Sequence, residues 1–376
     1  MNTNAANYAE VLERVASTTI AEHAAQVDQE GAFPAASIAA LREAGLLGAV
    51  SAVEVGGLGL GMEGASRIVR RIAEECGSTA MVVTMHYCGA AVLEAHGSME
   101  VRRAAASGEH LSTLAFSEAG SRSHFWAPNG TAETQNGHIV LNASKSWVTS
   151  ASRAAAYVWS SKPVSAEGFS TLWLVPASSG GLTVKGPFHG LGLRGNDSSP
   201  VAADGVTVPA GARLGEDGKG FDIMMGVVLP LFNVLIASCS NGLMAGAIRR
   251  TVAHAAAVRH SDTGATLGDL PTIRNYIARM RVKASMADAL LQDTIAALGA
   301  QRADGMLRVL ECKAASGEAA TEVLDMAMRV CGGAAFRKEV GVERLFRDGR
   351  AAGVMSPTTD QLYDFIGKAV CGMPLF

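Results

Sequence analysis

The side chains best suited to proton transfer near the C-terminus lie in the stretch GVMSPTTDQLYDFIG, residues 353–367. Ser356 and Pro357 close a loop of small residues, and the amphipathic run after it carries an acidic pair, Asp360 and Asp364. A carboxylate can act as a general base when burial raises its pKa toward neutrality. An acid in the first turn of a helix is also favoured simply because it interacts well with the helix dipole. The sequence leaves both interpretations of Asp360 open.

A second candidate for proton transfer is His86, within TMHYCG, because imidazole changes its protonation state close to neutral pH. The run that carries it is apolar, so a buried and hydrogen-bonded histidine is the alternative interpretation. No histidine follows His260, so the C-terminal loop contains no imidazole of its own. The cysteines lie apart, without a CxxC pair or a cluster with histidine. This spacing predicts reduced thiols rather than zinc ligands or disulfides.

The 376-residue chain has an ordinary globular composition, with 48% hydrophobic residues and a formal net charge of −3. Such a charge provides no attraction to nucleic acid or to an anionic membrane. The most apolar window, residues 223–240, contains Pro230 and Asn233, and we expect a buried helix there rather than a membrane span. The N-terminus has no basic stretch followed by an apolar one, so we expect a cytoplasmic protein.

Three segments with different periodicity must position the candidate side chains. Residues 1–110 are predicted to be helical; FPAASIAALREAGLLG, for example, has proline at its start, an apolar face and glycine at its end. Residues 111–215 contain short β-branched and aromatic runs separated by turn signals such as Asn136-Gly137, typical of an antiparallel sheet or barrel. Residues 216–376 return to helical periodicity. The sequence therefore predicts a mainly α fold with an inserted β domain.

Several stretches, taken in their order along the chain, resemble the acyl-CoA dehydrogenase superfamily. The two flavin-contacting strand regions of that family are similar to LAFSEAGS and NASKSWVTSA. The exit from its β domain is similar to GLGLRGNDSSPVAADGVTVPAGARLGEDGKGF, and its C-terminal helix, glycine pair and substrate loop to MRVCGGAAFRKEVGVERLFRDGRAAGVM. The resemblance covers essentially the whole chain. It implies an N-terminal helical domain, a central antiparallel β domain and a C-terminal four-helix bundle, in an oxidoreductase that acts on an acyl thioester or related small molecule.

The resemblance also implies that FAD binds between the β domain and the bundle. The isoalloxazine of FAD is a flat apolar ring system whose edges need a few hydrogen bonds. Phe116 and Ser117 would serve its pyrimidine edge, while Trp147 and Thr149 would cover the ring and reach toward N5. The alternative interpretation of Trp147 and Thr149 is a core aromatic and an ordinary strand residue.

Contacts to the rest of the cofactor follow the family pattern less closely. Family members place an arginine and an aromatic residue, and further on a glutamine, around a neighbouring subunit's dinucleotide. Arg259 matches the arginine, whereas Thr263 and Pro271 replace the other two residues. We therefore expect FAD, with FMN or an exchangeable reduced flavin as the alternative.

Three further residues match family positions near the flavin phosphates. Gly332 and Gly333 match a glycine pair that lets the backbone approach the pyrophosphate closely. Thr358 matches a threonine at a helix start, where backbone amides favour anions. Because the family shares these contacts between subunits, the resemblance implies a homodimer or homotetramer.

The glutamate that serves the family as catalytic base is missing from both of its positions. In the loop before the last helix Ser356 replaces it, and in the early helix after the β domain Phe232 does. Neither side chain can act as a base at neutral pH.

Three hypotheses follow from this loss. The first is an oxidoreductase in which another carboxylate takes the proton, with Asp360 nearest in sequence and Glu118 and Asp364 as weaker candidates. The second is a monooxygenase that uses reduced flavin from a flavin reductase, with Ser356 or His86 beside the flavin. The third is a relative without redox activity that binds flavin or a thioester. An electron-transfer partner or a flavin reductase is a possible further partner.

A last departure concerns the substrate. Family members often have aspartate after the serine of AGSD, whereas this chain reads AGSRSHFW. Ser121 matches a serine near the thioester or pantetheine. Arg122 could pair with a carboxylate, sulfinate or phosphate, or could be a solvated loop arginine.

Overall fold

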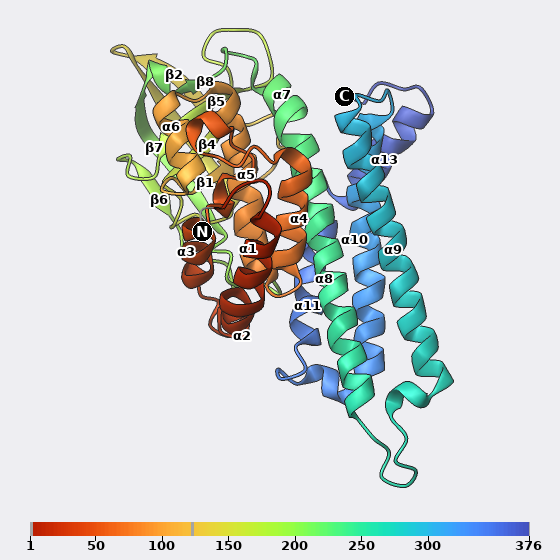
Figure 1. The fold of residues 1–376 in the computed structure, drawn as a ribbon. Coiled ribbons are helices and arrows are strands. Elements are labelled where there is room, and N and C mark those ends of the chain that lie inside the picture. The colour runs from red at the N-terminus through yellow and green to blue at the C-terminus, as the bar shows by residue number, and fades with distance from the viewer. Residues whose placement is uncertain (1–2, 122–123, 376) are drawn as a thin grey trace.

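The computed structural model describes residues 3–121 and 124–375. An N-terminal helical domain and a β domain lie side by side against a bundle of long helices (Figure 1). The predicted fold class, helices with an inserted β domain, is confirmed. One apolar cluster is continuous from the N-terminal helices into the bundle, and a second fills the β domain.

The N-terminal domain contains the helices that cover one side of the site. Their bounds are α1 (Tyr8–Val15), α2 (Ala21–Glu30), α3 (Ala35–Glu43), α4 (Gly61–Ala73), α5 (Gly77–His96) and α6 (Met99–Ser107). Among them α5 is apolar on nearly every face, because it packs against α4, β1 (Ser112–Ala115) and α8 (Leu229–Ala257). This central position brings α5 next to both other domains.

The β domain consists of two four-stranded sheets within the described residues. Their order is β1-β4-β5-β8 and β2-β3-β7-β6, with β2 (Thr131–Gln135), β3 (His138–Val148), β4 (Ala156–Ser161), β5 (Thr171–Pro176), β6 (Leu182–Val184), β7 (Ser199–Pro209) and β8 (Arg213–Leu214). Asn136 and Gly137 both have positive φ, and they form the tight β2–β3 turn that their sequence predicts. The strand pairs are antiparallel except β1 with β4, which run parallel; the long connection that a parallel pair needs contains β2 and β3 of the other sheet.

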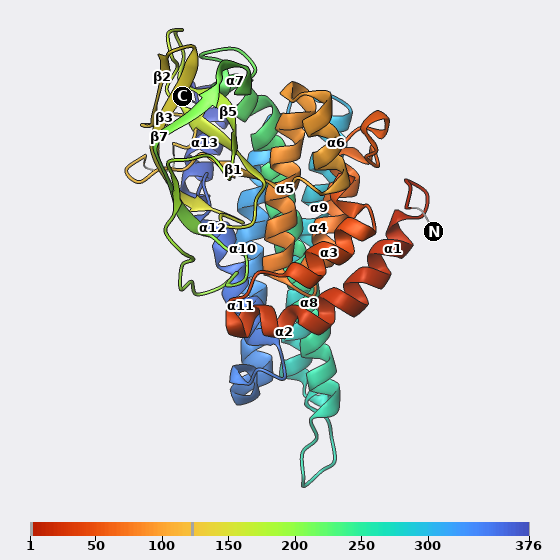
Figure 2. The same cartoon turned by 90° about the vertical axis from the view of Figure 1, so that its left-hand side faces the viewer.

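The C-terminal domain is built on α8, α9 (Pro271–Gly299) and α10 (Gly305–Cys331), which lie side by side (Figures 1 and 2). Shorter helices complete it: α7 (Gly220–Ile223), α11 (Val342–Gly349), α12 (Ala351–Val354) and α13 (Thr359–Val370). The apolar segment predicted to be a buried helix, residues 223–240, covers the end of α7, the π-helical stretch Met224–Val228 and the start of α8. Within the helix that spans Gly220–Ala257, 78% of the most apolar window is buried in the protein.

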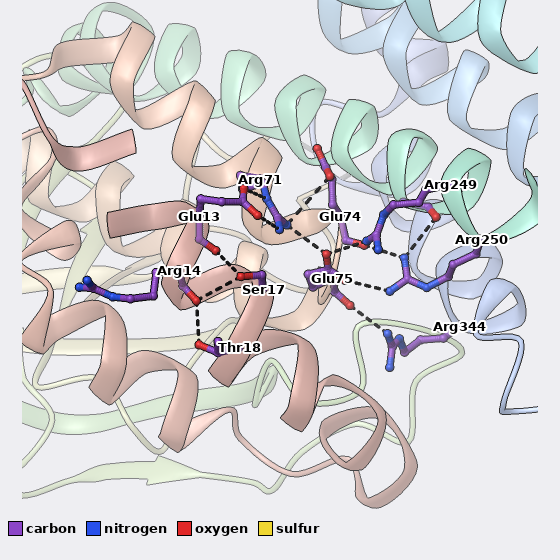
Figure 3. Close-up of polar contacts among 11 residues, drawn as sticks. Glu13, Arg14, Ser17, Thr18, Arg71, Glu74, Glu75, Arg249, Arg250 and Arg344 are labelled. Atoms are coloured by element: carbon purple, nitrogen blue, oxygen red, sulfur yellow. Dashed lines mark hydrogen bonds and ion pairs between the residues drawn. The ribbon is translucent and has the colours of Figure 1, made fainter. Parts of the chain in front are cut away.

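An ion-pair network joins the end of α4 to the bundle (Figure 3). Glu75, which is only 5% exposed, accepts from Arg71 (3.1 Å), Arg249 (2.6 Å) and Arg250 (3.1 Å). Its backbone carbonyl accepts from Arg344 of α11 at 2.9 Å. A buried carboxylate needs such partners, because an unpaired charge is costly away from water. The network therefore fixes α11 relative to the N-terminal domain.

Candidate active site

A cavity of about 720 Å³ lies where the three domains meet. Its apolar wall comes from α5, α8 and the segment after α11; its polar wall comes from the ends of β1 and β3 and from the loop before β7. The apolar side chains of the first wall include Met81, Met85, Val228, Leu229, Phe232, Val354 and Met355. A space of this size and polarity suits a small organic ligand held by a few fixed polar groups.

Phe232 and Ser356 both line this cavity, although 124 positions separate them in the sequence (356 − 232). Phe232 comes from the first turn of α8, and Ser356 follows α12. Phe232 and Met355 both pack against a buried cluster that includes Leu193. The two positions at which the family resemblance would place a glutamate are therefore occupied here by an aromatic ring and a hydroxyl.

Glu118 is the one carboxylate among the described lining residues, and both of its oxygens have partners. Lys145 Nζ donates to Oε1 at 2.7 Å, and the backbone N–H of Asn129 donates to Oε2 at 2.7 Å. Lys145 also donates to the Ser160 backbone carbonyl at 2.7 Å and is 1% exposed. Burial lowers the pKa of Lys145 to about 8, against the opposing effect of Glu118. The pair joins the turn after β1 to β3.

Trp147 presents a large aromatic face to the cavity and is 63% exposed. The register of β3 against β7 shifts between Lys145 and Val148, and this bulge changes the direction of the Trp147 side chain. The ring lies against Phe188, with ring centroids 4.0 Å apart. Thr149 lines the same cavity, and its carbonyl accepts from Thr113 Oγ1 at 2.8 Å. Trp147 is therefore not the core aromatic of the alternative interpretation.

The loop from Phe188 to Ser198 is held in place from outside the β domain. Asp348 Oδ1 accepts from the Leu193 N–H at 2.6 Å, and Ser78 Oγ accepts from the Gly195 N–H at 3.1 Å. Burial raises the pKa of Asp348 to about 6. A Cβ on Gly192 would lie 2.5 Å from the backbone of Arg347, so only glycine allows this approach.

Arg194 was not singled out by the sequence, yet it lines the cavity. Its guanidinium pairs with no carboxylate among the residues that the structure describes. Asn196 and Ser198, from the same loop, line the cavity as well. A single arginine in a glycine-rich loop carries no local signal of this placement, because α11 and α5 position the loop.

The structure brings Phe116, Ser117, Ser121, Trp147, Thr149 and Ser356 together around the cavity. Arg122 lies outside the described residues. Asp360 does not line the cavity; it is exposed in the first turn of α13. Thr358 is the N-cap of that helix, where its side chain accepts from the Gln361 N–H.

His86 of α5 does not line the cavity, and it is fully buried. Its Nδ1 accepts from the Ser112 N–H at 3.1 Å, and its Nε2 donates to the Leu47 carbonyl at 3.2 Å. Burial lowers the pKa of His86 to about 4, so the ring is neutral at pH 7. With both nitrogens occupied, His86 fits the buried, hydrogen-bonded alternative rather than a role in proton transfer.

Arg259, Gly332 and Gly333 do not line the cavity either. Arg259 is exposed in the segment between α8 and α9, and the glycines form the exposed turn that follows α10. Both regions are at the end of the bundle farthest from the β domain (Figure 1). A Cβ on either glycine would meet open space, so a ligand could approach this backbone from outside.

The chain matches the N-terminal, middle and C-terminal domains described for acyl-CoA dehydrogenase, over residues 4–107, 113–206 and 218–371. It is 30% identical over 347 residues to the mitochondrial short-chain specific acyl-CoA dehydrogenase of Homo sapiens, covering 90% of this chain and 82% of the relative. It is 26% identical over 359 residues to the probable acyl-CoA dehydrogenase YngJ of Bacillus subtilis, covering 93% of each.

Solved structures show the same fold. A glutaryl-coenzyme A dehydrogenase in complex with glutaryl-CoA superposes with a TM-score of 0.91 at 24% identity, covering 100% of this chain and 98% of that one. The butyryl-CoA dehydrogenase of Megasphaera elsdenii gives a TM-score of 0.90 at 19% identity, covering 99% and 100%.

Proposed function

The chain belongs to the acyl-CoA dehydrogenase family of flavoprotein oxidoreductases, and we propose that it binds FAD beside an acyl thioester. In this proposal the chain supplies no carboxylate at either position where family members have the catalytic base. The observation that carries this proposal is the shared cavity of Phe232 and Ser356. Glu118 does not replace the lost glutamate, because Lys145 and two backbone amides already engage its oxygens.

The residues around the cavity fit a flavin. Trp147 offers an exposed flat ring next to hydroxyl and backbone groups of Ser117 and Thr149, and an isoalloxazine needs this combination of apolar face and polar edge. We propose that these residues and Phe116 hold the ring system, and that Ser121 contacts the thioester. The chemistry that FAD supplies when bound is acceptance of a hydride. This chain's residues would orient the acyl group and exclude water from it.

A missing base predicts little turnover of ordinary substrates. Removal of an α-proton from a saturated acyl-CoA needs a base within hydrogen-bond reach, and no free carboxylate lies among the described lining residues. The test is an anaerobic titration of flavin-loaded protein with straight-chain acyl-CoAs, following the flavin absorbance. We expect no rapid bleaching. Rapid bleaching by any of these acyl-CoAs would show that a base is present, and would contradict the proposal that the site has lost it.

A reduced-flavin-dependent monooxygenase is the second candidate. Ser356 supports it, because this residue lines the cavity and its hydroxyl can donate a hydrogen bond. His86 gives no support, since its ring nitrogens are occupied elsewhere. The test is oxygen consumption with reduced FMN or FAD supplied by a flavin reductase, with and without candidate substrates. The first candidate instead needs an electron-transfer partner.

We also propose a homo-oligomer, a dimer or tetramer, in the cytoplasm. The segments that carry Arg259 and the pair Gly332-Gly333 lie at the end of the bundle farthest from the β domain (Figure 1), so we propose that they contact a neighbouring subunit's cofactor rather than their own. Light scattering after gel filtration tests the assembly. A monomer that retains stoichiometric FAD would contradict it.

A further inference from the structure

Lys313 of α10 is a buried lysine whose ammonium group points at one short segment of backbone. The residue is 1% exposed. Its Nζ donates to the carbonyl oxygens of Ala352 at 3.1 Å, Met355 at 3.0 Å and Pro357 at 2.7 Å. No carboxylate pairs with Lys313 in the part of the chain that the structure describes. The three acceptors are therefore its only polar partners there.

This arrangement suits the chemistry of both sides. Burial lowers the pKa of Lys313 to about 7. In its protonated form the amine has three N–H donors and no acceptor, so three carbonyls satisfy it completely. The four-residue helix α12 leaves its last carbonyls without intrahelical partners, and the cis Ser356-Pro357 bond follows directly. Buried carbonyls and a buried ammonium would each be costly alone, so each requires the other.

The segment that Lys313 holds is a wall between two cavities. Met355 and Ser356 face the main cavity. Pro357 lines a second, wholly apolar cavity of about 80 Å³. Phe125 and Leu229 line both spaces, so the two cavities adjoin at these side chains. Lys313 lines neither cavity, and it acts on them only through the backbone that it holds.

We propose that Lys313 is a positioning residue that fixes the wall of residues 352–357, keeps the two cavities apart and thereby limits the length of the acyl chain that the site accepts. The limit on chain length rests on the proposed function; the fixing of the wall does not. When the wall loosens, the second cavity, which Pro357 lines, becomes continuous with the main cavity. Longer apolar chains then gain buried surface, which favours their binding.

The first test measures the wall directly, by hydrogen–deuterium exchange of the intact protein read out by mass spectrometry. In Lys313→Met, which removes all three donors, we expect exchange in residues 352–358 at least tenfold faster than in wild type. Lys313→Gln keeps two donors and should fall between the two. Lys283→Met is the matched control, because Lys283 lies on the neighbouring helix α9 in a partly exposed pair with Glu322. Exchange in 352–358 that is unchanged in Lys313→Met would overturn the proposal.

If Lys313→Met does not fold, the proposal can still be tested by comparing exchange rates in two segments of the wild-type protein. Residues 352–358 should exchange more slowly than the exposed segment 258–266 between α8 and α9. Equal rates in wild type would show that Lys313 does not fix the wall.

The second test measures acyl-CoA binding by calorimetry over a series of chain lengths. Lys313→Met should shift the tightest-binding chain to a longer one, while Lys283→Met and wild type share the same optimum. An unshifted optimum would overturn the limit on chain length. If wild type binds no acyl-CoA, the proposed function and the chain-length limit both fail, and the exchange measurement decides the positioning role independently.

Discussion

Glu118 Oε1 lies 2.7 Å from Lys145 Nζ, and this buried pair joins the two strand regions that form the polar wall of the cavity. The side chain of Lys145 is 0% exposed and that of Glu118 is 4% exposed. Because neither group reaches water, each depends on the other for its charge.

Glu118→Gln should destabilise the protein by about 3–5 kcal/mol, since it leaves the Lys145 ammonium buried without a counter-charge. Urea unfolding at pH 7 measures the change. Asp222→Asn is the control, because it removes a carboxylate from an exposed pair with Lys219 and should change the free energy of unfolding by less than about 1 kcal/mol. Equal, small effects in the two variants would show that the Glu118–Lys145 pair is not structural.

Trp147→Ala should lower flavin content or shift the flavin absorbance bands, while far-UV circular dichroism stays unchanged. The physical reason is that Trp147 is 63% exposed on the cavity wall, so its removal takes away ligand contact and little core packing. Trp147→Phe keeps an aromatic face and should retain most of the flavin. Unchanged flavin content and spectrum in the alanine variant would return Trp147 to a purely structural role.

Ser356→Glu should restore at most a trace of flavin bleaching by acyl-CoA. A carboxylate at this position would still face the ring of Phe232 and the cluster with Met355 around it, so the shape of the pocket as well as its base has changed. Asp360→Asn serves as the comparison, and it should leave bleaching unaffected because Asp360 is exposed in the first turn of α13. Full activity in Ser356→Glu would mean that the loss of the base alone prevents dehydrogenation by the wild-type protein.

The stability of the wild-type protein relative to His86→Gln should fall as the pH falls from 6.5 toward 4. Burial lowers the pKa of His86 to about 4, so over this range the unfolded chain binds a proton that the folded chain does not. The slope reaches on the order of 1.4 kcal/mol per pH unit, and the difference levels off below pH 4. Urea unfolding of both proteins at several pH values measures it. A difference independent of pH would mean that His86 is not held neutral.

The sequence by itself determined the features that depend on near neighbours in the chain. Helical and strand periodicity separated the three domains, and Asn136-Gly137 marked its turn because positive φ is needed there whatever the rest of the fold does. The resemblance of successive segments to the acyl-CoA dehydrogenase family also located Phe232 and Ser356, since each position is fixed by the matching residues beside it in the chain.

Only the tertiary structure decided which polar groups already have hydrogen-bond or ion-pair partners. Glu118 and His86 were both candidates for proton transfer by residue type, but Lys145, Leu47 and Ser112 supply their partners from distant segments. Asp348 fixes Leu193 across 155 residues, and Lys313 fixes Pro357 across 44. Such contacts have no period in the sequence, because they arise where separate elements pack together, and burial there sets both the partner and the pKa of each group.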